Sequence, residues 1–124
     1  MSEDAVFINF TNHYPASSWD GKQLKAAQTY GQVVDLPFPN IAPAATSNEL
    51  QQLADNYTQQ IRTLAGHAKA TILIMGEMTF TYIMVNRLLA LKMDCVATTS
   101  ERIVTEQDGK KISIFNFVQF RKYI

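Results

Sequence analysis

Runs of apolar, β-prone residues alternate with helical segments along most of this chain, and this alternation constrains the fold more than any other feature. Four such runs are expected to be strands: 5–10 (AVFINF), 32–36 (QVVDL), 70–75 (ATILIM) and 95–98 (CVAT). Runs that are apolar on both faces are typical of buried strands in parallel sheets. Strands that alternate with helices form such sheets through right-handed crossovers. The pattern predicts an α/β, Rossmann-like three-layer domain with a mostly parallel sheet.

Three helices are expected between these strands. Their predicted ranges are 19 to about 30, 46–66 and 79–91. The first two are predicted to begin at capping boxes, Ser17 with Asp20 and Thr46 with Glu49. The third is apolar on most sides, which indicates that one side packs on the sheet and another on a second subunit. We therefore expect a homodimer.

The end of the chain changes character. Two β-prone runs, 102–106 and 111–120, are joined through Asp108-Gly109, which predicts a C-terminal β-hairpin. A length of 124 residues fits one domain and leaves no room for two, so residues 1–124 are expected to form a single Rossmann-like domain.

Composition and charge exclude several classes of function. The formal net charge is zero, whereas proteins that follow long duplex DNA usually carry a basic stripe. The apolar stretches are too short to span a bilayer, and the acidic start Met1–Asp4 lacks the basic beginning of a signal peptide. We expect a cytoplasmic protein that binds neither duplex DNA nor membrane. The single cysteine, Cys95, is interpreted as a small buried hydrophobe.

Polar residues follow three of the predicted strands. Ligands of open parallel sheets bind beyond the carboxyl ends of the strands, so these residues are the candidate site. They are Thr11, Asn12 and His13 after the first strand, Gly76, Glu77 and Thr79 after the third, and Thr98, Thr99, Ser100 and Arg102 after the fourth.

The chemistry of these residues suits a small anion. Gly76 would let a ligand approach the backbone, and the helix after it would offer free N–H groups. Arg102 carries a planar cation that suits phosphate, and we expect it near the start of that helix. Each residue also has a structural interpretation, in which His13 bonds within its own loop, Glu77 caps its helix and the hydroxyls end a strand.

No motif indicates a cofactor. The sequence has no G-x-G-x-x-G, no P-loop and no G-x-S-x-G elbow. The two histidines, His13 and His67, are far apart and lack metal-ligand spacing. Neither a cofactor nor a metal site is predicted.

Several segments together resemble a known family. These are Phe10-Thr11-Asn12-His13, the run 76–86 (GEMTFTYIMVN), the run 97–102 (ATTSER) and the run 114–123 (IFNFVQFRKY). In order and spacing they resemble the small CRISPR-associated ring nucleases of type III systems, which are related to CARF domains. The resemblance covers about the first twenty and the last fifty residues, and the insert 14–18 departs from it.

The resemblance implies a function. Ring nucleases cut cyclic oligoadenylates, the second messengers of type III CRISPR effectors, and so switch off antiviral signalling. It implies metal-independent attack of a ribose 2′-OH on the neighbouring phosphorus, with cyclic tetra-adenylate as the expected ring. His13, Asn12 and Arg102 are then the expected catalytic residues, and Thr11, Gly76, Glu77, Thr79, Thr98, Thr99 and Ser100 the ligand-binding ones. Two alternatives stay open: a non-catalytic protein that sequesters the messenger, and a sensor subunit that reports it to a separate effector.

Overall fold

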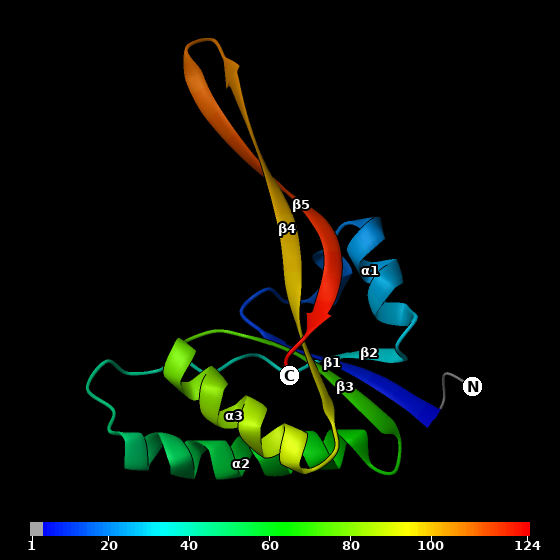
Figure 1. Ribbon diagram of the computed structural model, residues 1–124, viewed down its shortest axis with the longest axis vertical. Coiled ribbons are helices and arrows are strands. Elements are labelled where there is room, and N and C mark those ends of the chain that lie inside the picture. Colours follow the sequence, from blue (N-terminus) through cyan, green and yellow to red (C-terminus); the bar gives the residue numbers. More distant parts are fainter. Residues whose placement is uncertain (1–3) are drawn as a thin grey trace.

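The computed structural model describes residues 4–124, which build a five-stranded sheet with helices on both faces (Figure 1). The strand order is β2-β1-β3-β4-β5, with bounds β1 Ala5–Thr11, β2 Gln32–Asp35, β3 Lys69–Met75, β4 Asp94–Gln107 and β5 Lys110–Lys122. Strands β1 to β4 run parallel, and β5 runs antiparallel to β4. The predicted Rossmann-like fold is confirmed. Most of the acidic start Met1–Asp4 lies outside the described residues.

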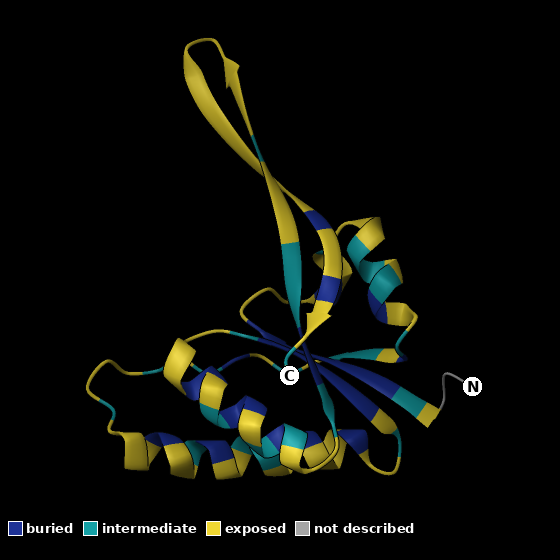
Figure 2. Cartoon of the chain, viewed as in Figure 1, coloured by how far each residue is buried: buried dark blue, intermediate teal, exposed yellow. Residues whose placement is uncertain are grey.

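The two faces of the sheet are covered differently. Because side chains alternate along a strand, Val6, Ile8 and Phe10 of β1 enter one core and Phe7 enters the other. Helices α2 (Ser47–Ala65) and α3 (Met78–Ala90) cover the first face, whereas α1 (Gly21–Gln28) covers the second (Figures 1 and 2). No helix in the described part of the chain is long and apolar enough to cross a membrane.

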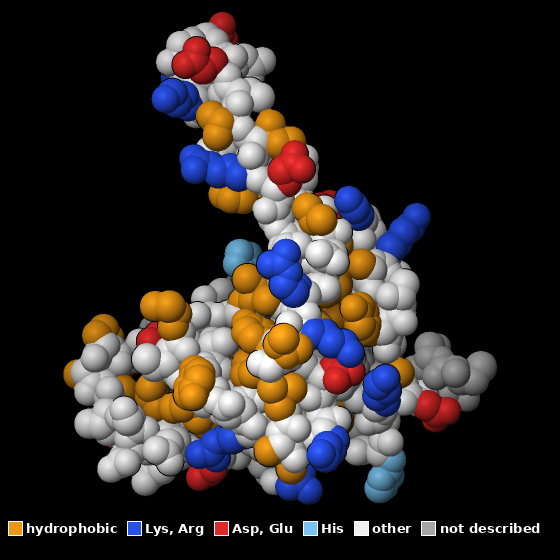
Figure 3. Space-filling view, in the orientation of Figure 1, with side chains coloured by type: hydrophobic (Ala, Val, Ile, Leu, Met, Phe, Trp, Pro, Cys, Tyr) orange, Lys and Arg blue, Asp and Glu red, His pale blue; other side chains and the backbone are white. Residues whose placement is uncertain are grey.

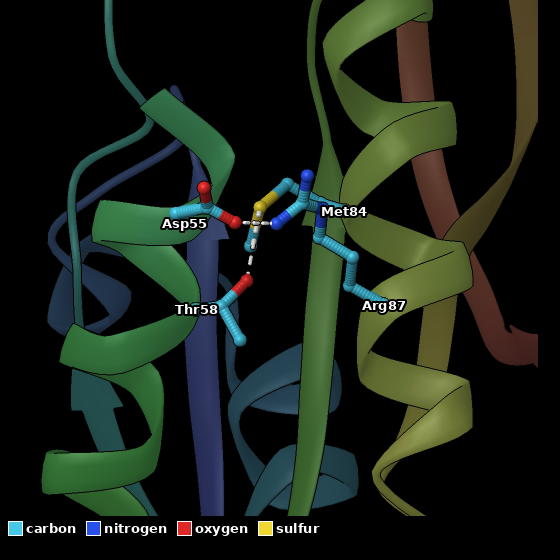
Figure 4. A network of polar contacts seen from close by, with 4 residues as sticks. All are labelled: Asp55, Thr58, Met84 and Arg87. Atoms are coloured by element: carbon cyan, nitrogen blue, oxygen red, sulfur yellow. Dashed lines mark hydrogen bonds and ion pairs between the residues drawn. The ribbon is translucent and has the colours of Figure 1, made fainter. Parts of the chain in front are cut away.

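Helices α2 and α3 are joined by polar contacts as well as by packing. Arg87 of α3 forms an ion pair with Asp55 of α2, and the Thr58 hydroxyl lies 3.8 Å from the Met84 sulfur (Figure 4). These contacts fix α3 beside α2 and leave its other flank free: Met78 is 83% exposed and Tyr82 is 72% exposed. The expected burial of α3 is therefore confirmed on one side only.

The predicted helix ends are confirmed at α2 and wrong at α1. Thr46 and Glu49 form the complete capping box, with both side chains bonded to backbone N–H groups. At α1 the N-cap is Asp20, whose carboxylate accepts from the backbone N–H of Gln23. Ser17 instead lies in a single turn of 3-10 helix, Ala16–Ser18, so the chain enters α1 later than predicted.

The predicted end of the fourth strand is also wrong. Strand β4 continues to Gln107 because β5 pairs with it along almost its whole length, with a bulge between Thr99 and Ser100. Asp108 and Gly109 form the predicted turn, both with positive φ as a two-residue hairpin turn requires. The outer half of this hairpin projects from the body and is mostly exposed (Figures 1 and 2).

Candidate functional site

A cavity of about 400 Å³ lies on the α1 side of the sheet, at the carboxyl ends of β1 and β3. The strand order reverses between these two strands, and ligands of open α/β sheets bind at such a switch point. The lining residues come from β1, the loop after it, the start of α1, and strands β3 to β5: Thr11, His13, Trp19, Asp20, Gln23, Leu73, Met75, Thr98, Ser100, Phe115 and Phe117.

The loop that carries His13 is held by a buried amide. Asn9 is fully buried on β1, and its side-chain amide donates to the His13 carbonyl (3.1 Å) and to the Asp35 carboxylate (2.9 Å). Its oxygen accepts from the Thr11 hydroxyl (2.8 Å), which in turn accepts from the His13 backbone N–H (2.9 Å). The hydrogen bonds that hold His13 in the loop are thus made by its backbone N–H and carbonyl, and His13 lines the cavity.

Two further contacts brace the same loop. The Trp19 indole N–H donates to the His13 carbonyl at 2.9 Å. The Asp35 carboxylate accepts the backbone N–H of Ala16 at 3.0 and 3.2 Å. The position of His13 therefore depends on β1, β2 and the approach to α1 together.

The hydroxyls of β4 divide between two faces. Thr98 and Ser100 line the cavity, and the Thr98 hydroxyl also lies 2.9 Å from the Met75 sulfur. Thr99 points to the opposite face, because side chains alternate, and its hydroxyl donates to the Gln119 carbonyl. Four of the predicted site residues, Thr11, His13, Thr98 and Ser100, are therefore brought together, and Thr99 is not.

The residues after β3 have structural roles at the start of α3. Glu77 is the N-cap: its carboxylate accepts from the Thr79 hydroxyl (2.6 Å) and the Phe80 backbone N–H (2.8 Å). These bonds lower the pKa of Glu77, the Thr79 bond most. The space beside Gly76 is occupied by the Phe38 ring, which would lie 2.4 Å from an added Cβ. None of the three lines the His13 cavity; Gly76 lines a different cavity, between α3 and the chain end.

Asn12 and Arg102 also lie outside the cavity lining. Asn12 is exposed in the loop. Arg102 pairs with Phe115 on the hairpin, and its guanidinium donates to the Ser113 hydroxyl at 3.1 and 3.4 Å. Since Phe115 lines the cavity, Arg102 lies at its rim on the α1 side of the sheet. The prediction that places it beside the start of α3, on the other side, is wrong.

Two other cavities offer less chemistry. One of about 610 Å³ lies between α2 and the end of β2, and side-chain amides dominate its polar lining. The other, of about 490 Å³, lies between α3 and the chain end, and Met78, Tyr82 and Ile124 make it largely apolar. Neither contains a histidine or lies at the switch point.

Cys95 is buried, as predicted. Burial, and secondly the nearby Asp94 carboxylate, raise the pKa of its thiol to about 12. A thiol with such a pKa is not a nucleophile at neutral pH. Among residues 4–124, no group of three His, Cys, Asp or Glu side chains lies close enough to hold a metal ion.

Several lining residues are not evident from the sequence pattern. Trp19 and Gln23 belong to a segment expected to be simple helix, and Phe117 is an ordinary core residue by its spacing. Asn9, which holds the loop and does not line the cavity, does carry a recognisable signal, because it is the one polar residue in the apolar run 5–10.

Comparison with known proteins gives one match. A search of curated proteins and a search of solved structures find no match to the chain. The model of the uncharacterized protein MJ1673 family matches residues 5–121, which include all five strands except the last residue of β5. The chain therefore belongs to the MJ1673 family.

Proposed function

We propose that this protein binds a cyclic oligoadenylate in the His13 cavity and cleaves it without a metal ion. The observation that carries the proposal is the grouping of His13 with the hydroxyl side chains of Thr98 and Ser100, above the buried Thr11, at the switch point of the sheet. The resemblance of four segments to CRISPR-associated ring nucleases supplies the substrate class. The protein would then end antiviral signalling in the cytoplasm.

The size of the cavity favours two copies acting on one ring. A volume of about 400 Å³ lies at the low end of the roughly 300–1,000 Å³ typical of small-molecule sites. It suits part of a ring of several nucleotides and not the whole. A cyclic tetra-adenylate has rotational symmetry, so a two-fold dimer would offer both halves of the ring equal contacts.

The proposed reaction uses a nucleophile from the substrate. The ribose 2′-OH attacks the adjacent phosphorus, the bond from phosphorus to the 5′-oxygen breaks, and a 2′,3′-cyclic phosphate and a 5′-OH result. One proton leaves the 2′-oxygen and one reaches the departing 5′-oxygen. His13 is the proposed group that moves a proton, since an imidazole can exchange one near neutral pH.

The remaining polar groups would hold the phosphate in line. Correct orientation alone can lower a barrier by several kcal/mol. The Thr98 and Ser100 hydroxyls and the Gln23 amide are neutral donors in the lining, and Arg102 stands at the rim as a cation. Donors that are already oriented stabilise charge on phosphoryl oxygens as it develops. Asn12 is exposed in the loop and lies outside the lining, so no role in the reaction is proposed for it.

The test uses the two histidines of the chain as a matched pair. Wild type, His13→Ala and His67→Ala are incubated with cyclic tri-, tetra- and hexa-adenylate in EDTA, and the products are separated by chromatography. His67 is exposed in the turn between α2 and β3, at the opposite edge of the sheet, and serves as the control. We expect linear products from wild type and His67→Ala, and cleavage slower by about 10²-fold or more in His13→Ala.

The same experiment decides the second candidate function, which is sequestration. That alternative is favoured by one observation: Asp20, the carboxylate of the lining, is already engaged as the N-cap of α1, so His13 has no free acidic partner there. Tight binding of a ring that stays intact with wild type would establish sequestration. Strict dependence of cleavage on added Mn²⁺ or Mg²⁺ would refute the proposed mechanism.

A further inference from the structure

Phe115 is exposed in a way that the other aromatic side chains of β5 are not. It is 66% exposed, whereas Phe117 and Phe120 on the same strand are 4% and 8% exposed. Phe117 and Phe120 pack with Phe7 in the core beneath α1. Phe115, on the same strand β5, is not part of that core and still lines the His13 cavity. A large aromatic ring is therefore presented to whatever occupies the cavity.

The neighbours of Phe115 on its face of the hairpin include a cation and two hydroxyls, beside the apolar Val104 and Phe117. Arg102 is its partner across the ladder, so both side chains project from the same face. The Ser113 hydroxyl, also on this face, accepts from the guanidinium at two nitrogens and so fixes its direction. One step toward the body lies Ser100, which lines the cavity. Ring, cation and hydroxyl thus form a continuous rim.

The opposite face of the hairpin has a different character. Ile112 and Ile114 are 38% and 47% exposed there, and their ladder partners are Thr105 and Ile103. Hydrophobic side chains are visible along the hairpin between charged ones (Figure 3). An aliphatic face suits another protein surface. An exposed ring between an arginine and a hydroxyl is the arrangement that single-stranded nucleic acids occupy, with bases stacked on rings and phosphates on cations.

We propose that Phe115 is a stacking platform for one adenine base of the bound oligoadenylate, with Arg102 paired to the adjoining phosphate. The proposal rests on the proposed function, which supplies the ligand. It adds two residues that bind the ligand at the mouth of the cavity. Arg102 suits the task because its planar guanidinium both pairs with phosphate and lies flat beside aromatic rings. The platform binds and does not react, so it acts on affinity and leaves the cleavage step to the cavity.

The chain carries its own reporter for the test. Its single tryptophan, Trp19, lines the same cavity, so intrinsic fluorescence reports ligand binding. Titrations with cyclic tetra-adenylate and with linear tetra-adenylate compare wild type, Phe115→Ala, Phe115→Leu and Ile114→Ala. Ile114→Ala is the matched control, since it removes a neighbouring exposed side chain from the opposite face.

Stacking of one base on an aromatic ring is typically worth enough to change Kd by roughly fivefold to a hundredfold. We expect a loss of that size for Phe115→Ala, little recovery for Phe115→Leu, and a change below about twofold for Ile114→Ala. Phe115→Leu keeps an apolar side chain and removes the ring face, so it separates stacking from simple hydrophobic contact.

Failure of the platform and failure of the proposed function give different results. If wild type binds the cyclic ring and Phe115→Ala binds it as tightly as Ile114→Ala does, the platform is wrong and the function stands. If wild type binds only the linear tetra-adenylate, with loss in Phe115→Ala, the platform stands and the function fails. Light scattering gives the third outcome, in which Phe115→Ala lowers the oligomeric mass, Ile114→Ala does not, and the affinity of each chain for the ligand is unchanged. Phe115 is then a contact between protein chains, and the stacking platform is overturned.

Discussion

Removal of the Asn9 side chain should destabilise the fold and displace His13 together. Asn9→Ala deletes three hydrogen bonds of 2.8–3.1 Å that join Asn9 to the Thr11 hydroxyl, to the His13 carbonyl and to the Asp35 carboxylate. Asp35 and the His13 loop are exposed and regain water, so they contribute less to the loss. Thr11 is 1% exposed, and its hydroxyl is left without an acceptor, which costs about 1–3 kcal/mol. The expected total is about 2–4 kcal/mol.

Urea unfolding measures this loss. For an m-value of about 2 kcal/mol/M, in the middle of the usual range, the midpoint of Asn9→Ala should fall by roughly 1–2 M. Asn12→Ala is the matched control, because Asn12 is exposed in the same loop, and its midpoint should not move. Cleavage by Asn9→Ala should also slow, since the His13 carbonyl then keeps only the Trp19 indole as donor. An unchanged midpoint for Asn9→Ala would refute the view that this buried network holds the loop.

Three further perturbations have defined outcomes. Gly76→Ala should lower the free energy of unfolding by about 1–3 kcal/mol in urea, because its Cβ would meet the Phe38 ring at 2.4 Å. Gly21→Ala is the control, since the space beside Gly21 is open, and equal urea midpoints for the two variants would contradict the close packing at Gly76. Cys95 should not react with iodoacetamide at pH 8 until the protein unfolds, because burial raises the pKa of its thiol to about 12. Rapid alkylation of Cys95 in the folded protein would show that the thiol is accessible. Arg102→Ala should weaken cyclic tetra-adenylate binding by roughly tenfold to a hundredfold and flatten its salt dependence, and unchanged affinity would remove Arg102 from the site.

Features set by local chemistry could be predicted from the sequence. The capping box at Thr46 and the stop at Gly66 bound α2 because each acts through bonds within a few residues. The Asp108-Gly109 turn is predictable because both positions require positive φ, which these residues tolerate. The buried strands follow from continuous apolar runs. These local rules were sufficient for the order of elements and for the class of fold.

Features set by tertiary contacts could not be predicted. Strand β4 includes Thr98, Thr99 and Ser100 because β5 pairs with it there, and no local property of these three residues predicts that pairing. The role of Gly76 depends on Phe38, which lies far away in the sequence and packs beside it.

The candidate site was predictable in part for the same reason. The rule that ligands bind beyond parallel strands identified Thr11 and His13, since β1 ends where its polar residues begin. The rule applies less well to Arg102, because it assumes a strand end that the hairpin removes. By its sequence Phe115 is one residue of a β-prone run, and only the ladder places it opposite Arg102 above the cavity.

The central claim is that the cavity beside His13 holds the ligand, and the two histidines permit a direct test. His13 lies at the carboxyl edge of the sheet and His67 at the amino edge, about 20 Å away along a strand of this length. Imidazole NMR signals are recorded from histidine-labelled protein in EDTA during titration with cyclic tetra-adenylate. The account predicts that the His13 signals shift with saturation and that those of His67 stay fixed. Saturable binding that leaves the His13 signals unmoved would contradict it.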